Sequence, residues 1–227
     1  MNRQIGNSVS HILLVVGVIW FASVAPHASS DIPIVQLSYA DGFDSVCSQQ
    51  AHYAIKPAWV AEVNSRLPEF AANWKRDGEP LMRAIEQIVG TPFRDKELLV
   101  ALSVCSFPSM SDPLLVNVRF SLKSFTPDSV PPDVTTSIIL HEILHHYLSD
   151  KLSHGSRLLR QYAGEDETVT SHLHLMALMN AAYVTLREPD TMKRVIAKDR
   201  ELPNRSYGRA WDIVQAEGYS AFVSELK

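Results

Sequence analysis

The chain has 227 residues, of which 46% are hydrophobic and 20% are charged, and its formal net charge is −4. This composition is sufficient for one sizeable buried core and excludes general disorder. A mildly acidic chain without a cluster of lysine and arginine lacks the charge pattern of a nucleic-acid-binding protein, so we expect no nucleic-acid partner.

The first thirty residues have the composition of a secretory signal peptide. Arg3 is their only charged residue, an unbroken apolar run covers Ile12 to Ala22, and small residues precede Asp31. This order is typical of a signal peptide, and the run is shorter than the roughly twenty apolar residues that cross a bilayer. We therefore expect residues 1–30 to be removed on export, which leaves residues 31–227 as a single secreted or periplasmic domain without stable membrane insertion. The alternative is an uncleaved N-terminal anchor.

The apolar pattern of the N-terminal half predicts a small sheet and two helices. A short strand is expected at Ile34 to Ser38, and helices at Pro57 to Ala72, where Pro68 interrupts the pattern, and at Pro80 to Val89. Branched apolar residues then predict two strands separated by a turn, at Glu97 to Cys105 and Leu114 to Leu122.

The C-terminal half reads as helical. After a loop that ends in two prolines, a strongly apolar helix is expected from Asp133 to about Asp150. A polar connection leads to a second helix from about Asp166 to Arg187, and a last helix is expected from about Tyr207 to Leu226. Together these elements predict an α+β fold.

Two cysteines, Cys47 and Cys105, are present in the chain. In an oxidising compartment they can pair, which would close a loop of about sixty residues and stabilise the fold by roughly 3–4 kcal/mol. Two buried thiols are the alternative.

A cluster of histidines carries the chemistry that the sequence suggests. Within it, His141, Glu142 and His145 form an HExxH motif inside the apolar helix. Residues four apart lie on one face of a helix, so both imidazoles can reach one ion. Zinc accepts two imidazoles and a third protein ligand and keeps a position for water, whose proton Glu142 can take. A buried cluster of hydrogen-bonded polar residues is the alternative reading, and His146 and His154 are interpreted as structural or solvent-facing.

The motif resembles the zincin superfamily of zinc metallopeptidases, over about a quarter of the chain. The metzincin branch is excluded, because Leu148 and Lys151 stand where its pattern requires glycine and histidine. The gluzincin branch takes its third ligand from a glutamate near the start of a following helix, which implies Glu167 here. Glu165 is an alternative, and so are His172 and His174, because the helical faces do not distinguish them.

The resemblance also implies a substrate edge and a group that holds the oxyanion. The strand at Leu114 to Leu122 is the expected cleft edge, to which a peptide adds as a further strand, unless it is an ordinary sheet strand. Tyr207 and Arg209 are the expected oxyanion groups, and Tyr147 and Tyr162 are alternatives.

These features predict an exported zinc (Zn2+) metallopeptidase with a zincin-like α+β fold, a small sheet before the active-site helix, and a peptide or protein substrate. His141, His145 and Glu167 are the expected metal ligands, with Glu142 as general base and Tyr207 as a catalytic residue. The competing hypothesis is a non-catalytic zinc-binding or interaction protein that has this fold. Hydrolysis of a non-peptide amide is a third reading.

Overall fold

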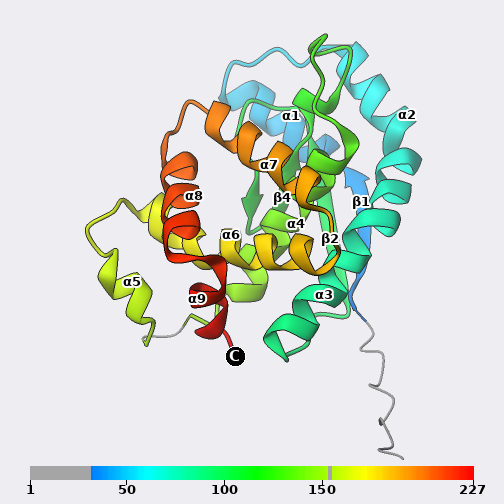
Figure 1. Ribbon diagram of the computed structural model, residues 1–227. Coiled ribbons are helices and arrows are strands. Elements are labelled where there is room, and N and C mark those ends of the chain that lie inside the picture. The colour runs from blue at the N-terminus through cyan, green and yellow to red at the C-terminus, as the bar shows by residue number, and fades with distance from the viewer. Residues whose placement is uncertain (1–31, 153–154) are drawn as a thin grey trace, which may run out of the picture.

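The computed structural model describes residues 32–152 and 155–227 (Figure 1). The predicted signal peptide and His154 lie outside the described residues. The strands are β1 (Ile34–Tyr39), β2 (Glu97–Ser103), β3 (Met110–Ser111) and β4 (Leu114–Asn117). The helices are α1 (Asp41–Gln50), α2 (Pro57–Asn73), the π-helix η1 (Trp74–Gly78), α3 (Glu79–Val89), the 3-10 helix η2 (Arg119–Ser121), α4 (Pro132–Leu148), α5 (Arg157–Gln161), α6 (Glu167–Thr185), α7 (Pro189–Glu201), α8 (Ser206–Glu217) and α9 (Tyr219–Ser224).

The four strands form one mixed sheet in the order β1-β2-β4-β3. β1, β2 and β4 are parallel to one another, and β3 is antiparallel to β4. The expected α+β class is therefore confirmed: a small mixed sheet near the N-terminal end of the described chain precedes a mostly helical remainder.

The expected cleft edge is corrected by this topology. β4 pairs on both sides, with β2 and with β3, so its backbone has no free edge for a peptide. The edge strands are β1 and the two-residue β3, and β3 lies in the segment expected to be a turn. The strand expected to run to Leu122 ends at Asn117, because the chain turns into η2; Phe120 is consequently 49% exposed and Ser121 is buried.

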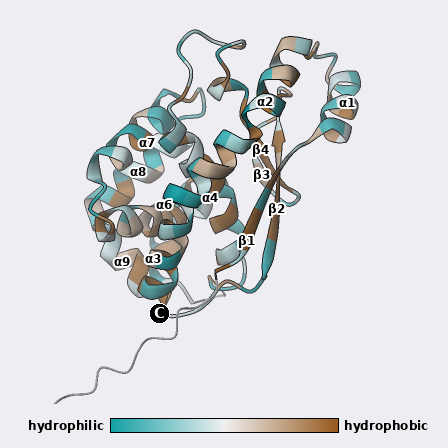
Figure 2. Ribbon diagram, turned by 90° about the vertical axis from the view of Figure 1, so that its right-hand side faces the viewer, coloured by the Kyte–Doolittle hydropathy of each residue, from teal (hydrophilic) through white to brown (hydrophobic). Residues whose placement is uncertain are grey.

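The helices form a layer on one side of the sheet, and α1 lies on the other side (Figure 2). α4 contacts β3 and β4 as well as α6, and α6 contacts α3, α7, α8 and α9. Residues 172–179 of α6 are all buried, as a helix surrounded by other helices requires. The two helices that carry the histidine cluster are thus the packed centre of the helical layer.

Three α-helices were not expected from the sequence, namely α1, α5 and α7. α1 and α7 are rich in polar and charged residues and bury only a few side chains each, so their apolar pattern is weak. The last predicted helix is two helices, α8 and α9, because Gly218 has a φ of 79° and interrupts the run.

Pro68 does not interrupt α2. Pro68 and Asn64, whose carbonyl loses its helical partner, are both exposed, so water can satisfy that carbonyl. The helix continues into η1, where Trp74 packs directly against Gly78: a Cβ atom at Gly78 would lie under 3.0 Å from three atoms of the indole ring.

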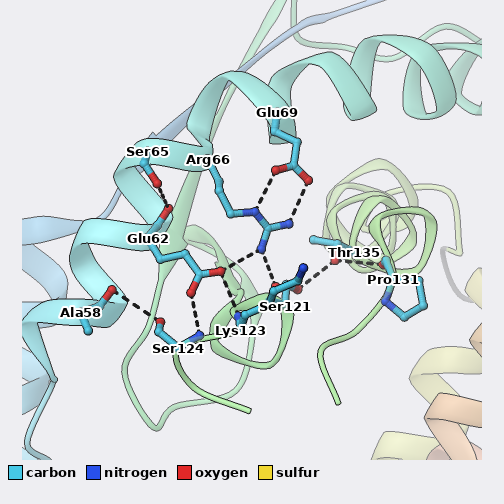
Figure 3. Close-up of polar contacts among 10 residues, drawn as sticks. All are labelled: Ala58, Glu62, Ser65, Arg66, Glu69, Ser121, Lys123, Ser124, Pro131 and Thr135. Carbon is cyan, nitrogen blue, oxygen red and sulfur yellow. Dashed lines mark hydrogen bonds and ion pairs between the residues drawn. The ribbon is translucent and has the colours of Figure 1, made fainter. Parts of the chain in front are cut away.

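A polar network holds the start of α4 in place (Figure 3). From α2, Arg66 donates a hydrogen bond of 2.6 Å to the carbonyl of Ser121. The hydroxyls of Ser121 and Thr135, the latter in the first turn of α4, lie 2.8 Å apart. Glu62 accepts hydrogen bonds from two successive backbone amides of the same loop. The loop before α4 is therefore fastened to α2, and this fixes where the helix begins.

Cys47 of α1 and Cys105, just after β2, form a disulfide, as the first of the two alternatives predicts. At the same junction the buried carboxylate of Asp44 accepts hydrogen bonds from the Ser103 hydroxyl and from the amide of Val104, the latter at 2.9 Å. In the part of the chain that the structure describes, no helix combines the length and the apolar character that spanning a membrane requires.

Candidate metal centre

Three histidine side chains from two packed helices converge on one point. His141 and His145 lie one turn apart on α4, and His172 comes from α6. The Nε2 atom of His145 lies 3.2 Å from that of His141 and 3.1 Å from that of His172. All three ligand atoms lie within 4.8 Å of one another, so this three-His group can hold a metal ion.

Two of the three separations between the nitrogens are close to those in a tetrahedral zinc site. Tetrahedral zinc binds imidazole nitrogen at about 2.0–2.1 Å, which places two such ligands about 3.3 Å apart. The two short separations are 3.1 and 3.2 Å. Without an ion, two neutral imidazole nitrogens at this distance repel each other unless one of them donates a proton to the other. A single proton on Nε2 of His145 can satisfy only one of its two contacts.

The tautomer of His172 is set by its own helix. Its Nδ1 atom lies 2.6 Å from the carbonyl oxygen of Thr168, one turn earlier, and therefore carries the proton. The hydroxyl of Ser171 lies 3.1 Å from the same nitrogen. Nε2 is then left with its lone pair directed at the other two histidines, which is the form that a metal binds.

The electrostatic environment keeps the three imidazoles neutral. Burial, together with repulsion from His172, lowers the pKa of His145 to about 4. Burial and the other two histidines lower the pKa of His141 well below its ordinary value. Burial also lowers the pKa of His172, although the Thr168 carbonyl and Asp166 oppose the effect. Neutral imidazole is the ligand form, so none of the three needs to lose a proton near pH 7 before binding an ion.

Glu142 follows His141 on α4 and is buried, and its carboxyl influences Tyr207, which packs against His141 and His172. Its side chain belongs to a residue that is only 7% exposed, and burial raises the pKa of its carboxyl to about 8. A nearby cation favours the ionised form of a buried carboxyl. An ion bound by the three histidines would therefore lower the pKa of Glu142.

Tyr207, in the first turn of α8, lies against the same histidines. Its ring centroid is 4.7 Å from that of His172 and 6.0 Å from that of His141. Burial, with smaller effects of the Glu142 and Asp199 carboxylates, raises the pKa of its phenol to about 12. The hydroxyl is therefore protonated at neutral pH and can donate a hydrogen bond.

The structure does not bring Glu167 to this group. Glu167 is exposed at the start of α6, and His172, one of the named alternatives, occupies the third position. Positions five apart on a helix differ in direction by about 140°, so turning His172 inward turns Glu167 outward. Glu165 pairs with Arg209, whose Nε lies 3.0 Å from its carboxylate, and both Glu165 and Glu167 line a cavity of about 470 Å³ beside α5. Asp166 accepts a hydrogen bond from the amide of Val169 and caps α6.

The remaining candidates are engaged elsewhere. His174 points to the opposite side of α6, where its Nε2 atom lies 2.9 Å from the carboxylate of Glu225. The hydroxyls of Tyr147 and Tyr162 donate to the carbonyl of Thr91 and to Glu217. His146 is exposed and lies 2.8 Å from Asp95.

One signal in the sequence pointed to His172. It stands on the face of α6 that also carries Val169, Met176 and Met179, and these three residues are at most 1% exposed. A single histidine on so apolar a face requires a polar partner from another element. No known protein family, no curated protein and no solved structure matches this chain.

Proposed function

We propose that this protein is a zinc-dependent hydrolase, and specifically a metallopeptidase. The observation that carries the proposal is the convergence of three neutral imidazole nitrogens, from His141, His145 and His172, together with the buried carboxyl of Glu142 on the helix that carries two of them. Three protein ligands and an adjacent general base are the composition of a catalytic zinc site, whereas structural zinc sites have four protein ligands.

The number of ligands favours the enzyme over the non-catalytic zinc-binding alternative. That alternative requires a fourth protein ligand, and within the described residues the group that can hold an ion contains three residues only. His174, which the sequence left open as an alternative ligand, is directed at Glu225 on the other side of α6.

When bound, zinc would polarise the scissile carbonyl and acidify the water that it coordinates. Glu142 would act as the general base: its carboxylate oxygen would accept a proton from the attacking water and later deliver it to the leaving amine. Tyr207 keeps its phenolic proton and donates a hydrogen bond to the carbonyl oxygen as negative charge develops there. The carbonyl oxygen of Thr168 accepts the hydrogen bond from Nδ1 of His172, which leaves Nε2 of His172 without a proton.

A peptide is the substrate class that the fold accommodates best. α4 contacts β3, the antiparallel edge strand of the sheet, so a free strand edge lies next to the helix that carries Glu142. An extended peptide can pair with such an edge. The Cys47–Cys105 disulfide supports an oxidising location, which is consistent with the proposed export.

The first test is the zinc content of the purified protein after metal reconstitution. We expect about one zinc per chain in the wild type and in Glu142→Gln, and a loss of most zinc in His145→Ala and His172→Ala. Glu167→Gln and His146→Ala are matched controls from the same two helices, and both should retain zinc. A wild type that binds no zinc overturns the proposal, and loss of zinc in Glu167→Gln but not in His172→Ala overturns the ligand set.

The second test separates hydrolysis from zinc binding alone. Zinc-loaded wild type is incubated with a mixture of unfolded proteins and the products are identified by mass spectrometry. We expect new peptide termini with the wild type and a rate that is lower by about 10²–10⁴-fold with Glu142→Gln, the usual contribution of a general base. Cleavage at equal rates by both proteins contradicts the role of Glu142.

A further inference from the structure

A cavity separate from the three-His group lies beside the last turn of α4. It is a cavity of about 190 Å³ between the segment that leads into β2 and the end of α4. None of its lining residues belongs to the metal group. The lining residues are Pro33, Phe93, Arg94, Asp95, Leu98, His146, Tyr147, Ser149 and Lys151.

Part of the cavity wall is apolar and well packed. The rings of Phe93 and Tyr147 lie 4.3 Å apart, centroid to centroid, and Pro33 and Leu98 are buried. The Tyr147 hydroxyl donates to the Thr91 carbonyl at 2.7 Å, so the polar end of this side chain already has its partner. This wall suits a compact hydrocarbon group.

The other part presents an ammonium group with a spare donor. The Nζ atom of Lys151 donates to the Thr91 hydroxyl at 2.9 Å and lies 4.4 Å from the centre of the Tyr147 ring. An ammonium group has three donors, and these two contacts leave one free. Among the described residues no carboxylate lies within ion-pair distance of Lys151, although the side chain is half-buried.

The other charged side chains that line the cavity already have partners. Arg94 forms an ion pair with Asp150, and Asp95 lies 2.8 Å from Nε2 of His146. Burial lowers the pKa of Lys151, and the charge of Arg94 lowers it further, as expected for two cations close together. Among the charged residues that line the cavity, Lys151 is therefore the one without an ion pair. Arg94 has further donors besides the one that binds Asp150, so it can also contact an anion.

We propose that this cavity binds a small organic carboxylate, with the carboxylate on Lys151 and Arg94 and a compact apolar group against Phe93 and Tyr147. The volume limits the size of the ligand. A water molecule occupies about 30 Å³ in the liquid, so the cavity has room for about six waters, or for a group the size of one amino-acid side chain with its carboxylate. The C-terminal residue of a peptide and a free apolar acid have this same chemistry.

The test uses the full chain and follows chemical shifts in 1H–15N spectra during titration with N-acetyl-leucine. We expect saturable shifts confined to residues near 93–98 and 146–151. In Lys151→Met, which keeps the length of the side chain and removes its charge, binding should weaken at least tenfold. Arg94→Gln, at an exposed position, should weaken it severalfold without affecting folding. Lys75→Met, at an exposed lysine on η1, is the control and should bind as the wild type does.

Three further probes define the ligand class. Leucinamide, which has the same side chain but a positive charge, should not bind, and inorganic phosphate should bind more weakly than N-acetyl-leucine. The dipeptide N-acetyl-alanyl-leucine binds as tightly as N-acetyl-leucine if the natural ligand is a peptide C-terminus, and does not bind if it is a free acid. Binding of leucinamide or phosphate at the affinity of N-acetyl-leucine, or unchanged binding by Lys151→Met, overturns the proposal. These results do not depend on zinc, since both substitutions leave the three-His group intact.

Discussion

The hydrogen bond from His172 to the Thr168 carbonyl determines which nitrogen of His172 can bind an ion. It assigns the proton to Nδ1 and leaves Nε2 with its lone pair towards His141 and His145. Because the acceptor is a backbone carbonyl on the preceding turn of the same helix, the tautomer is set by α6 itself and needs no further side chain. At this scale the proposed site consists of α4, which carries two of the three histidines and Glu142, and α6, which carries the third histidine in an oriented form.

In the proposed mechanism, the contribution of Tyr207 comes from its hydroxyl group alone. We expect Tyr207→Phe to lower the rate of peptide hydrolysis by about 10²–10³-fold, the usual effect of removing one donor to an oxyanion. Zinc content should be unchanged, because the ring that packs against His172 is retained. The measurements are kcat, KM and zinc content. Tyr162→Phe is the matched control, since its hydroxyl is bound by Glu217. Equal losses in the two variants would rule out a specific role for Tyr207.

At the scale of elements, the position of α4 depends on its neighbours α2, η1 and η2. The long α2–η1–α3 run contacts β1, α4 and α6, and the loop through η2 is fastened to α2 by Glu62 and Arg66 (Figure 3). Two variants test these connections separately, one in the packing of η1 and one in the polar network.

The contact between Gly78 and Trp74 tests the packing. A methyl group at Gly78 would overlap the indole ring of Trp74, which is 3% exposed and has little room to move. We expect Gly78→Ala to lower the free energy of unfolding by about 1–3 kcal/mol, as for other overpacked sites. Gly42→Ala in α1 is the control, because nothing lies within 4 Å of the added Cβ. There we expect no loss, and a gain of up to about 0.5 kcal/mol from helix propensity. Urea denaturation of both variants measures the difference.

The Glu62 carboxylate tests the polar network and its pH dependence. Burial opposes its ionisation, but hydrogen bonds from Ser124, Lys123 and Arg66 outweigh that effect and lower its pKa from 4.5 to about 2. A pKa depressed in the folded state stabilises the fold above the unfolded value, and this contribution is lost as the pH falls through the folded value.

We therefore expect Glu62→Gln to cost about 1–2 kcal/mol at pH 7, after allowance for solvent screening. The difference from the wild type should shrink as the pH is lowered from about 4.5 towards 2. Denaturant unfolding at several pH values measures it, with Glu97→Gln, at an exposed position of β2, as a surface control that should change nothing. A difference that stays constant down to pH 2 would show that Glu62 contributes through packing and not through its charge.

At the scale of the whole molecule, the helical layer and α1 lie on opposite sides of the sheet (Figure 2). α1 buries few residues, and it is held to the end of β2 by the disulfide and by the hydrogen bonds of Asp44. The disulfide closes a separation of 58 residues in the sequence. Its main effect is to restrict the unfolded chain.

We expect the double variant Cys47→Ser/Cys105→Ser to lose about 2–4 kcal/mol in the free energy of unfolding. A reducing agent should destabilise the wild type by a similar amount and leave the double variant unaffected, which is the internal control. Zinc content should be retained, because the three histidines come from helices on the other side of the sheet. A wild type that is insensitive to reduction would show that the two sulfurs are not bonded in solution.

Much of the fold could be predicted from local patterns. Alternation and apolar runs placed β1 and β2, and helical spacing placed α3, α4 and α6 close to their observed bounds. The pattern failed where few apolar residues mark an element, as in α1 and α7, and where tertiary hydrogen bonds decide the path, as at Asn117. There the side chain binds the carbonyls of Cys105 and Phe107 and the strand ends.

The candidate metal centre, like the fold, was predictable only where local sequence patterns determine the geometry. The sequence by itself determined the pairing of His141 with His145 and the neighbouring position of Glu142, because the geometry of one helix places residues four apart on one face. Only the tertiary structure decided that His172, and not Glu167, completes the group and that Tyr207 lies against it. The positions of these side chains depend on how α6 and α8 are rotated against α4. That rotation is set by side-chain packing across the whole helical layer, and the spacing of residues within one helix does not contain it.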